Sequence, residues 1–213
     1  MIEARQALGN AASLHDAMPP HPLPLIICFG DSLTAGWQSP LSGVSPAPET
    51  PPGKFLQARL KGRAAVSVCG VCGELTAEMV ARFRREALSL RPASSVILGG
   101  TNDLGWNVPP KDILRNLLTM YEDARREGVQ AVAVTVPSIR GFDDQIHRRR
   151  ELNALIAGAC ADRGIPCVDL FTATAEAETQ RLAGPYSNDG LHLTTAGYEL
   201  LATLLYEQVY RNL

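Results

Sequence analysis

The length, composition and charge of this chain describe an ordinary globular domain and exclude several classes of protein. The chain has 213 residues, of which 46% are hydrophobic and 20% charged, and its formal net charge is −2. A chain of this length buries a sizeable core, and its charge balance argues against a nucleic-acid partner, which normally meets a basic surface. No apolar stretch approaches the length of a membrane span. The basic run Arg148–Arg150 lies among acidic residues and is predicted to be a solvated helix face.

The first 22 residues are predicted to be an N-terminal extension, with a short helix around Glu3–His15 and a proline-rich end. Charged residues interrupt this stretch, so it lacks the continuous apolar core of a signal peptide. We therefore expect a cytoplasmic protein, with a secreted form whose signal has been removed as the alternative. The remaining residues, 23–213, are expected to form one domain.

Apolar strand-like runs alternate with helix-like segments through that domain. Val129–Val136, for example, is a near-continuous run of β-branched residues and alanine, typical of a strand buried on both faces. Such alternation predicts an α/β fold with a parallel sheet covered by helices on both sides. The expected strands are Leu23–Cys28, Ala64–Cys69, Ser95–Leu98, Val129–Val136 and Pro166–Phe171, and the expected helices are Lys54–Leu60, Leu75–Leu90, Asp112–Glu127, Asp144–Arg163 and Thr195–Tyr210.

A short glycine-containing turn follows the first predicted strand. Gly30 allows a tight exit that leaves Ser32 at the carboxyl end of the strand, where ligands bind in open α/β sheets. A serine after glycine and aspartate more often only caps a turn, and Asp31 either supports the site or fixes that turn. A serine hydroxyl becomes a useful nucleophile only beside a base. The motif therefore needs partners from elsewhere in the chain.

Three further clusters supply those partners. His192 would take the proton of Ser32 as general base, and Asp189, three residues earlier, would orient the imidazole. The side-chain amide of Asn102 and the backbone N–H groups of Ser32 and Gly73 would stabilise the oxyanion. The sequence thus predicts hydrolysis of a small-molecule ester or thioester through an acyl-enzyme.

Several residues compete for these roles. Asp103 and Asp169 are alternative partners of the imidazole, and Gly70 competes with Gly73 as an oxyanion donor. We favour Asp189 for its spacing from the histidine. The other histidines, His15, His21 and His147, are expected to have surface or structural roles.

Three apolar side chains are candidate substrate contacts. Trp37 follows the predicted nucleophile, and Leu104 and Trp106 follow Asn102, so all three fall in segments at the ends of strands. Core filling is the usual role of tryptophan, but a place in the wall of a substrate pocket fits these positions equally well. The long segment 38–53, rich in proline, serine and glycine, is expected to be a functional loop.

The pair Cys69 and Cys72 forms a Cys-x-x-Cys motif between a predicted strand and a predicted helix. A thioredoxin-type site places a cysteine of lowered pKa at such a helix N-terminus, whereas a zinc site would need two more ligands. The five cysteines are an odd number, and reduced thiols are the expectation. A redox role is therefore the less favoured reading.

The chain resembles the GDSL, or SGNH, hydrolase superfamily in four motifs that appear in the family's order. They are Gly30–Gly36, the glycine block around Gly73, Gly100–Asp103 and Asp189–His192. The resemblance implies a three-layer α/β/α sandwich of the flavodoxin-like SGNH type. It also implies esterase, lipase or thioesterase activity with no metal or cofactor, and it assigns signature roles to the serine, glycine, asparagine and histidine. A carbohydrate O-deacetylase or an acyltransferase using the same residues is the alternative.

Overall fold

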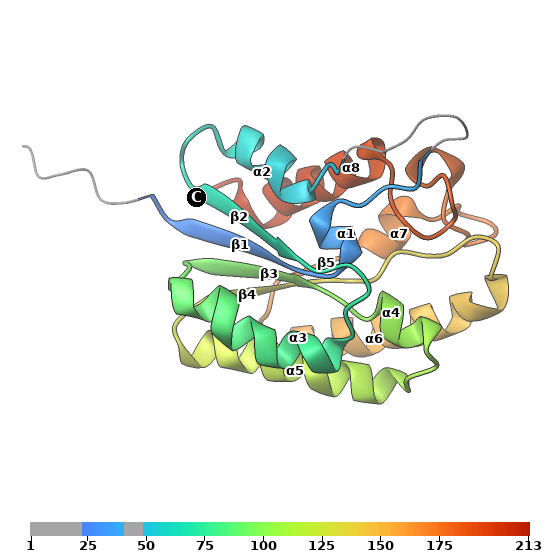
Figure 1. Cartoon of the computed structure of the whole chain (residues 1–213), viewed down its shortest axis with the longest axis horizontal. Helices are drawn as coiled ribbons and strands as arrows, with labels where there is room; N and C mark the ends of the chain where they lie inside the picture. The colour runs from blue at the N-terminus through green and yellow to red at the C-terminus, as the bar shows by residue number, and fades with distance from the viewer. Residues whose placement is uncertain (1–22, 41–48) are drawn as a thin grey trace, which may run out of the picture.

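The computed structural model describes residues 23–40 and 49–213, in which five strands form one sheet (Figure 1). Every pairing is parallel, and the strand order is β2-β1-β3-β4-β5. The predicted α/β class and five-stranded parallel sheet are confirmed. The predicted extension, with its helix, and residues 41–48 of the predicted loop lie outside the described residues. The strands are β1 (Leu25–Gly30), β2 (Ala65–Gly70), β3 (Ser94–Leu98), β4 (Gln130–Val134) and β5 (Cys167–Val168).

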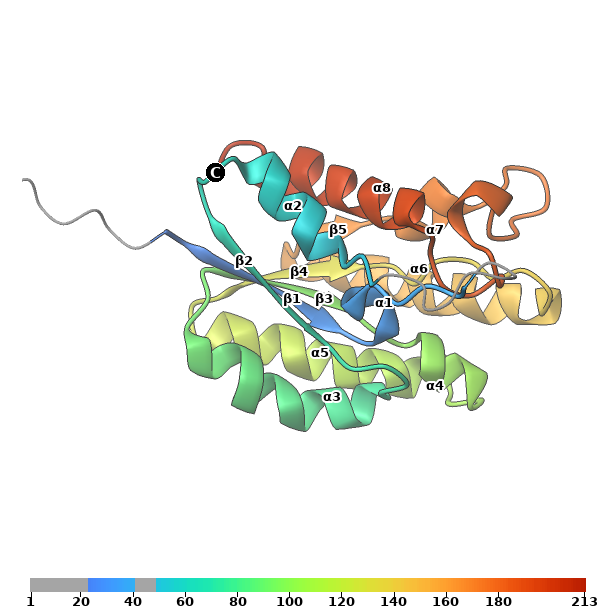
Figure 2. The ribbon, with the colours of Figure 1, turned by 45° about the horizontal axis from the view of Figure 1, so that its top comes forward.

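Helices cover both faces of the sheet and make three layers (Figures 1 and 2). α2 and α8 lie on one face, and α3 and α5 lie on the other, with α6 packed against α5. In α5, the buried Ile113, Leu117, Met120 and Ala124 recur three or four residues apart, which places them on the side that faces the sheet. The helices are α1 (Ser32–Ala35), α2 (Pro52–Leu60), α3 (Thr76–Arg82), α4 (Thr101–Gly105), α5 (Pro110–Arg126), α6 (Ile146–Arg163), α7 (Leu170–Thr174) and α8 (Thr195–Leu205).

The strand order places a topological switch point between β1 and β3. The chain runs from β1 outward to β2 and then crosses back over β1 to β3, so connections leave in opposite directions on either side of β1 and β3. Ligands bind at such switch points, beyond the carboxyl ends of the strands. Ser32 follows β1 and Asn102 follows β3, so both begin at this edge.

Some predicted elements are shorter or less regular than the sequence suggested. The predicted helix Leu75–Leu90 is α-helical only over α3 and continues as a π-helical turn, Phe83–Ala87, and a 3-10 turn. The predicted strand Pro166–Phe171 is wrong beyond Val168, because the Asp169 side chain accepts a hydrogen bond from Thr172 N and starts α7. A side chain that caps a helix competes with strand pairing in this way.

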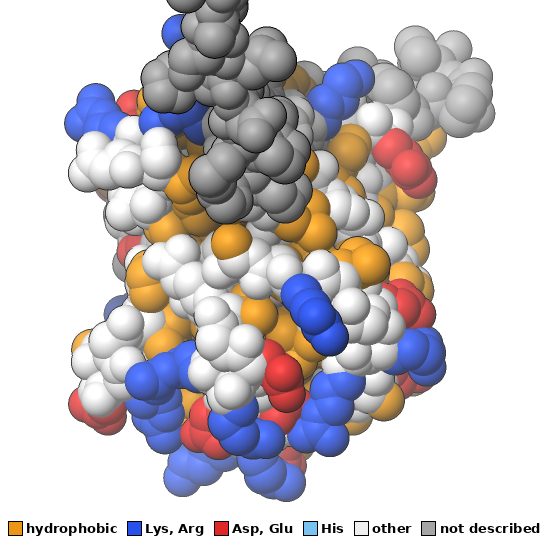
Figure 3. Space-filling model, turned by 90° about the vertical axis from the view of Figure 1, so that its left-hand side faces the viewer, with side chains coloured by type: hydrophobic (Ala, Val, Ile, Leu, Met, Phe, Trp, Pro, Cys, Tyr) orange, Lys and Arg blue, Asp and Glu red, His pale blue; other side chains and the backbone are white. Residues whose placement is uncertain are grey.

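The two ends of the sheet differ in what they carry. Figure 3 views the side where the strands begin, and basic and acidic side chains are mixed along its lower edge, with no single-sign patch there. The candidate site lies at the other end. Among the described residues, no helix is long and apolar enough to cross a membrane.

Candidate active site

The nucleophile candidate, Ser32, lies at the junction of β1 and α1. Gly30 ends the strand, and a Cβ there would lie 2.1 Å from the carbonyl oxygen of Leu98, so only glycine permits this approach of β1 to β3. Asp31 then starts the helix, since its Oδ1 accepts a hydrogen bond from Leu33 N over 2.9 Å. Ser32 is the first residue of α1 and is 5% exposed. The residues before Ser32 therefore place it at a strand-to-helix turn.

His192 is held by Asp189. The ring Nδ1 lies 2.8 Å from Asp189 Oδ2, while Oδ1 accepts hydrogen bonds from the N–H groups of Leu191 and His192, both at 2.8 Å. Burial acts to raise the pKa of Asp189, but the imidazole and these N–H groups together hold it well below its ordinary value. Asp189 is therefore a carboxylate at neutral pH and fixes the ring through Nδ1. Nε2 is then the ring nitrogen that Asp189 does not contact.

The turn that carries this pair depends on a glycine. Gly190 has a φ of 84°, and a Cβ there would lie 2.2 Å from the carbonyl oxygen of Arg140. The N–H of Arg140 in turn donates to the Gly190 carbonyl over 2.9 Å. The turn before His192 is thus anchored to the loop that follows β4.

Trp37 connects the imidazole to the segment of Ser32. Its ring packs edge-on against that of His192, with centroids 4.2 Å apart. The backbone N–H of Trp37 donates to the carbonyl oxygen of Ser32 over 3.0 Å. The Tyr198 hydroxyl donates a hydrogen bond to the backbone carbonyl oxygen of Trp37 over 2.6 Å and so helps to hold this residue in place. The charge of His192 also acts on Asp31: burial raises the pKa of this carboxyl, the Leu33 N–H and His192 partly oppose that rise, and the resulting pKa is about 7. The imidazole therefore lies beside the turn that bears Ser32.

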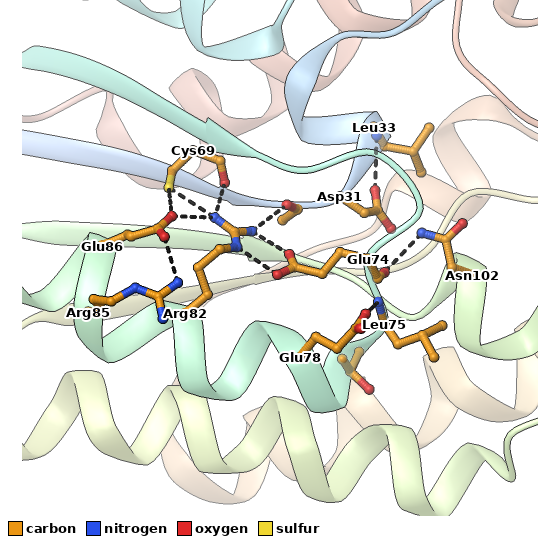
Figure 4. A network of polar contacts seen from close by, with 12 residues as sticks. Asp31, Leu33, Cys69, Glu74, Leu75, Glu78, Arg82, Arg85, Glu86 and Asn102 are labelled. Atoms are coloured by element: carbon orange, nitrogen blue, oxygen red, sulfur yellow. Dashed lines mark hydrogen bonds and ion pairs between the residues drawn. The ribbon is translucent and has the colours of Figure 1, made fainter.

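Two glycines, Gly70 at the end of β2 and Gly73 in the loop that follows, have different surroundings. A Cβ at Gly70 would lie 2.3 Å from Ala35 N, so Gly70 is required by the contact of β2 with α1. Gly73 has a φ of 79°, and nothing lies within 4 Å of its missing Cβ. The Asn102 amide Nδ2 donates to the carbonyl of Glu74, 3.0 Å away, which sets Asn102 beside this loop (Figure 4). Gly73, and not Gly70, is thus the open glycine next to Asn102.

A buried ion pair connects this loop to the strands, and it was not among the features predicted from the sequence. Arg82 Nε donates to Glu74 Oε1 over 2.7 Å, and each side chain is 7% exposed (Figure 4). Arg82 also donates to the carbonyl oxygens of Gly30 and Cys69, at 3.0 and 3.3 Å, where β1 and β2 end. One guanidinium therefore holds the ends of two strands and the loop before α3.

The other two candidate carboxylates are engaged elsewhere. Asp103 accepts hydrogen bonds from the N–H of Thr76 at 3.0 Å and from its hydroxyl at 2.6 Å, and Asp169 caps α7. Neither forms a hydrogen bond or ion pair with His192 among the described residues, whereas Asp189 does.

Two of the three predicted substrate contacts line a cavity of about 460 Å³ that Asn102 also lines. Leu104 is 2% exposed and contributes from the core, whereas Trp106 is 76% exposed. Trp37 is absent from this wall and packs on His192 instead. The wall includes further residues that the sequence did not single out as substrate contacts, among them Phe142 and Arg149.

Arg149 corrects a prediction. The run Arg148–Arg150 was expected to be a solvated helix face, but Arg149 is 2% exposed. Arg149 lies on the inward side of α6. Because three consecutive arginines have the same hydropathy, the sequence pattern does not show which of them faces inward. Arg148 is half-buried and bonds the carbonyl oxygens of Leu104 and Val108, and Arg150 is exposed.

The two cysteines of the Cys-x-x-Cys motif do not have the character of a reactive dithiol. All five cysteines are free thiols, and burial raises the pKa of both Cys69 and Cys72. A redox-active thiol needs the opposite shift. Arg82 Nη1 lies 3.0 Å from the Cys69 sulfur, where the thiol forms part of the polar network. No group of three His, Cys, Asp or Glu side chains within residues 23–40 and 49–213 could hold a metal ion.

Comparisons with known proteins place the chain in a family. The model of the GDSL-like lipase/acylhydrolase family matches residues 28–200. The lipase/acylhydrolase from Enterococcus faecalis is 27% identical, with 89% of this chain and 96% of that chain covered and a TM-score of 0.73. A GDSL-like lipase from Bacteroides thetaiotaomicron is 22% identical over 89% of both chains, with a TM-score of 0.72.

A mutant of an acetyl-xylooligosaccharide esterase from Geobacillus stearmophilus shares the fold at 17% identity, covering 88% of this chain and 94% of that chain with a TM-score of 0.70. A comparison with curated protein sequences found no match. Because the family model spans most of the sequence, and with it all four motifs, this chain belongs to the GDSL-like lipase/acylhydrolase family.

Proposed function

We propose that this protein hydrolyses carboxylic esters or thioesters through an acyl-enzyme on Ser32. The observation that carries the proposal is the contact of His192 with Asp189, 2.8 Å from Nδ1 to Oδ2, on a ring that packs against Trp37. An imidazole oriented by a carboxylate, beside a serine on a strand-to-helix turn, is the arrangement that activates a hydroxyl.

In the proposed reaction, Ser32 Oγ attacks the carbonyl carbon of the ester while His192 Nε2 takes the hydroxyl proton. The tetrahedral intermediate then collapses, the bond to the leaving alcohol or thiol breaks, and His192 returns the proton to that group. Water, deprotonated by the same imidazole, attacks the acyl-enzyme. The bond between the acyl carbon and Ser32 Oγ then breaks, His192 returns the proton to Oγ, and the carboxylic acid is released. Asp189 stabilises the imidazolium that forms in each half.

The negative charge on the carbonyl oxygen needs donors that are already in place. The N–H groups of Ser32 and Gly73 and the side-chain amide of Asn102 are the proposed donors. One N–H of Asn102 is occupied by the Glu74 carbonyl, which fixes the amide and leaves its second N–H for the oxyanion. Each such donor contributes roughly 3–4 kcal/mol to transition-state stabilisation in comparable enzymes.

The experiment that tests the proposal compares Ser32→Ala with the wild type on short-chain p-nitrophenyl esters. We expect a loss of at least about 10³-fold in kcat with the fold intact by circular dichroism. Ser89→Ala, an exposed serine on the 3-10 turn after α3, is the matched control and should keep full activity. Undiminished turnover by Ser32→Ala would refute the assignment.

A carbohydrate O-deacetylase is the second candidate. Two exposed aromatic side chains, Trp106 and Phe142, line the cavity beside Asn102, and such side chains suit a sugar ring. Proteins that share this fold include an acetyl xylan esterase, at 19% identity. Release of acetate from acetylated xylooligosaccharides, measured against p-nitrophenyl acetate, distinguishes this candidate. Product analysis with added alcohols separates hydrolysis from acyl transfer.

A further inference from the structure

Arg149 is a buried cation whose hydrogen bonds are incomplete. It projects from α6 and is 2% exposed. Its Nη1 donates to the carbonyl of Pro137 at 3.1 Å and to the hydroxyl of Thr101 at 3.4 Å, but its Nε has no hydrogen-bond partner. Buried charges are normally paired, because removing an ion from water without compensation is costly.

No carboxylate within the described residues forms an ion pair with Arg149. Burial lowers its pKa to about 10, while the charge of Asp31 acts to raise it without direct contact. Arg149 is therefore cationic at neutral pH. A guanidinium in this state has donors suited to a planar anion, since its fork matches the two oxygens of a carboxylate.

Arg149 is one of the residues that line the cavity next to Asn102. Around it, the wall is mainly apolar: Leu104 and Ile139 are buried, whereas Trp106 and Phe142 are 76% and 65% exposed. A large apolar pocket with a few convergent polar groups is typical of a small-molecule site. Here the polar side chains include the Asn102 amide and a cation that no carboxylate of the described residues contacts directly.

We propose that this cavity binds the part of the ester that carries a carboxylate, with Arg149 as its receptor and the aromatic side chains around an apolar or ring-shaped body. The proposal rests on ester hydrolysis at Ser32 and adds the substrate class. The carboxylate can lie on the alcohol side of the ester or on the acyl side. In both cases the substrate is a negatively charged ester. The carboxylate that Arg149 would bind is separate from the one that hydrolysis at Ser32 releases.

Two matched pairs of esters distinguish these sources. On the alcohol side, 4-acetoxybenzoate is compared with neutral 4-acetoxybenzamide. On the acyl side, the p-nitrophenyl half-ester of glutaric acid is compared with the corresponding ester of glutaramic acid. We expect kcat/KM to favour the charged member of one pair by at least about tenfold in the wild type. The ratio should fall to about one in Arg149→Gln and to an intermediate value in Arg149→Lys.

The matched control is Arg150→Gln, the exposed neighbour on the same helix, which should keep the wild-type ratio. The ratio of two substrates is the readout because a merely structural loss would lower both rates together. Equal kcat/KM within both pairs in the wild type, or a preference that survives in Arg149→Gln, overturns the proposal.

Binding to the wild-type protein tests the same proposal without turnover. The products of the four esters, 4-hydroxybenzoate against 4-hydroxybenzamide and glutarate against glutaramate, are titrated by calorimetry. In each pair the second member carries a carboxamide in place of the carboxylate that Arg149 would bind. Tighter binding of the anion by about tenfold or more supports the proposal even if Arg149 variants fail to fold or Ser32 proves not to be the nucleophile. If both anions bind no more tightly than their amides, the cavity has no carboxylate receptor.

Discussion

The side-chain amide of Asn102 donates to the carbonyl oxygen of Glu74 over 3.0 Å. The carboxylate of Glu74 is itself held by Arg82, which also bonds the carbonyl of Gly30, two residues before Ser32. The proposed oxyanion donor and the proposed nucleophile are therefore connected through one buried ion pair. Because this pair touches no reacting atom in the proposed mechanism, its role is to position the groups that do.

Removing one partner of this ion pair should destabilise the protein. We expect Glu74→Ala to lower the free energy of unfolding by about 3–5 kcal/mol, because the buried Arg82 charge then keeps only its longer ion pair with the more exposed Glu86, at 3.4 Å. The double variant Glu74→Met with Arg82→Met should lose less than the sum of the two single Met variants. Urea denaturation of the four proteins measures this coupling.

The control is Asp112→Asn, which breaks an exposed ion pair with Arg115 and should cost about 1 kcal/mol or less. Strictly additive losses at Glu74 and Arg82 would contradict the coupling.

Replacing Asp31 by asparagine should change how stability depends on pH. Burial raises the pKa of Asp31 from an ordinary 3.8 to about 7. Between about pH 4 and pH 7 the folded protein therefore binds a proton that the unfolded chain has lost, so this group makes stability fall as pH rises. Asp31→Asn keeps the acceptor for Leu33 N and removes the titration. Relative to the wild type, it should gain up to about 4 kcal/mol between pH 4 and pH 8.

Denaturant unfolding at several pH values measures this gain, with the exposed Asp144→Asn as the control. A difference between Asp31→Asn and the wild type that stays constant from pH 4 to pH 8 would show that Asp31 is not protonated in the folded protein.

Asp189→Asn should lower kcat on p-nitrophenyl esters by about 10³- to 10⁴-fold with little change in KM, because the amide favours the wrong tautomer of the imidazole. Asp169→Asn, a carboxylate that caps α7 and does not contact His192, should lose far less. Steady-state kinetics of both variants provide the comparison, and equal losses would remove Asp189 from its proposed role.

Gly70, the last residue of β2, and Gly73, in the loop that follows, should respond differently to alanine. At Gly70 the new methyl group would meet the backbone of Ala35 at 2.3 Å, so we expect a loss of roughly 2 kcal/mol or more in unfolding free energy. At Gly73 the space is open and only the positive φ opposes the substitution, which costs about 1 kcal/mol. Thermal unfolding of the two variants tests the order; a larger loss at Gly73 would contradict it.

Local features of the sequence were enough to predict most of the fold. The strands around Ile26–Phe29 and Val132–Val134 are apolar runs whose burial follows from composition. The strand that corresponds to β5 was predicted too long. The helix cap at Asp169 acts through a side chain, and a hydrophobic pattern does not reveal it. The π-helical turn after α3 likewise leaves no mark on periodicity.

The sequence by itself determined the α/β class, the approximate positions of the strands along the chain and the four motifs, because each depends on residues that are neighbours along the chain. Only the tertiary structure decided that Asp189 contacts His192 while Asp103 and Asp169 serve other contacts. It also decided the burial of Arg149 and the pairing of Glu74 with Arg82. These contacts join segments that are far apart in the sequence. Which side chains are buried or paired there depends on how the whole sheet packs against its helices.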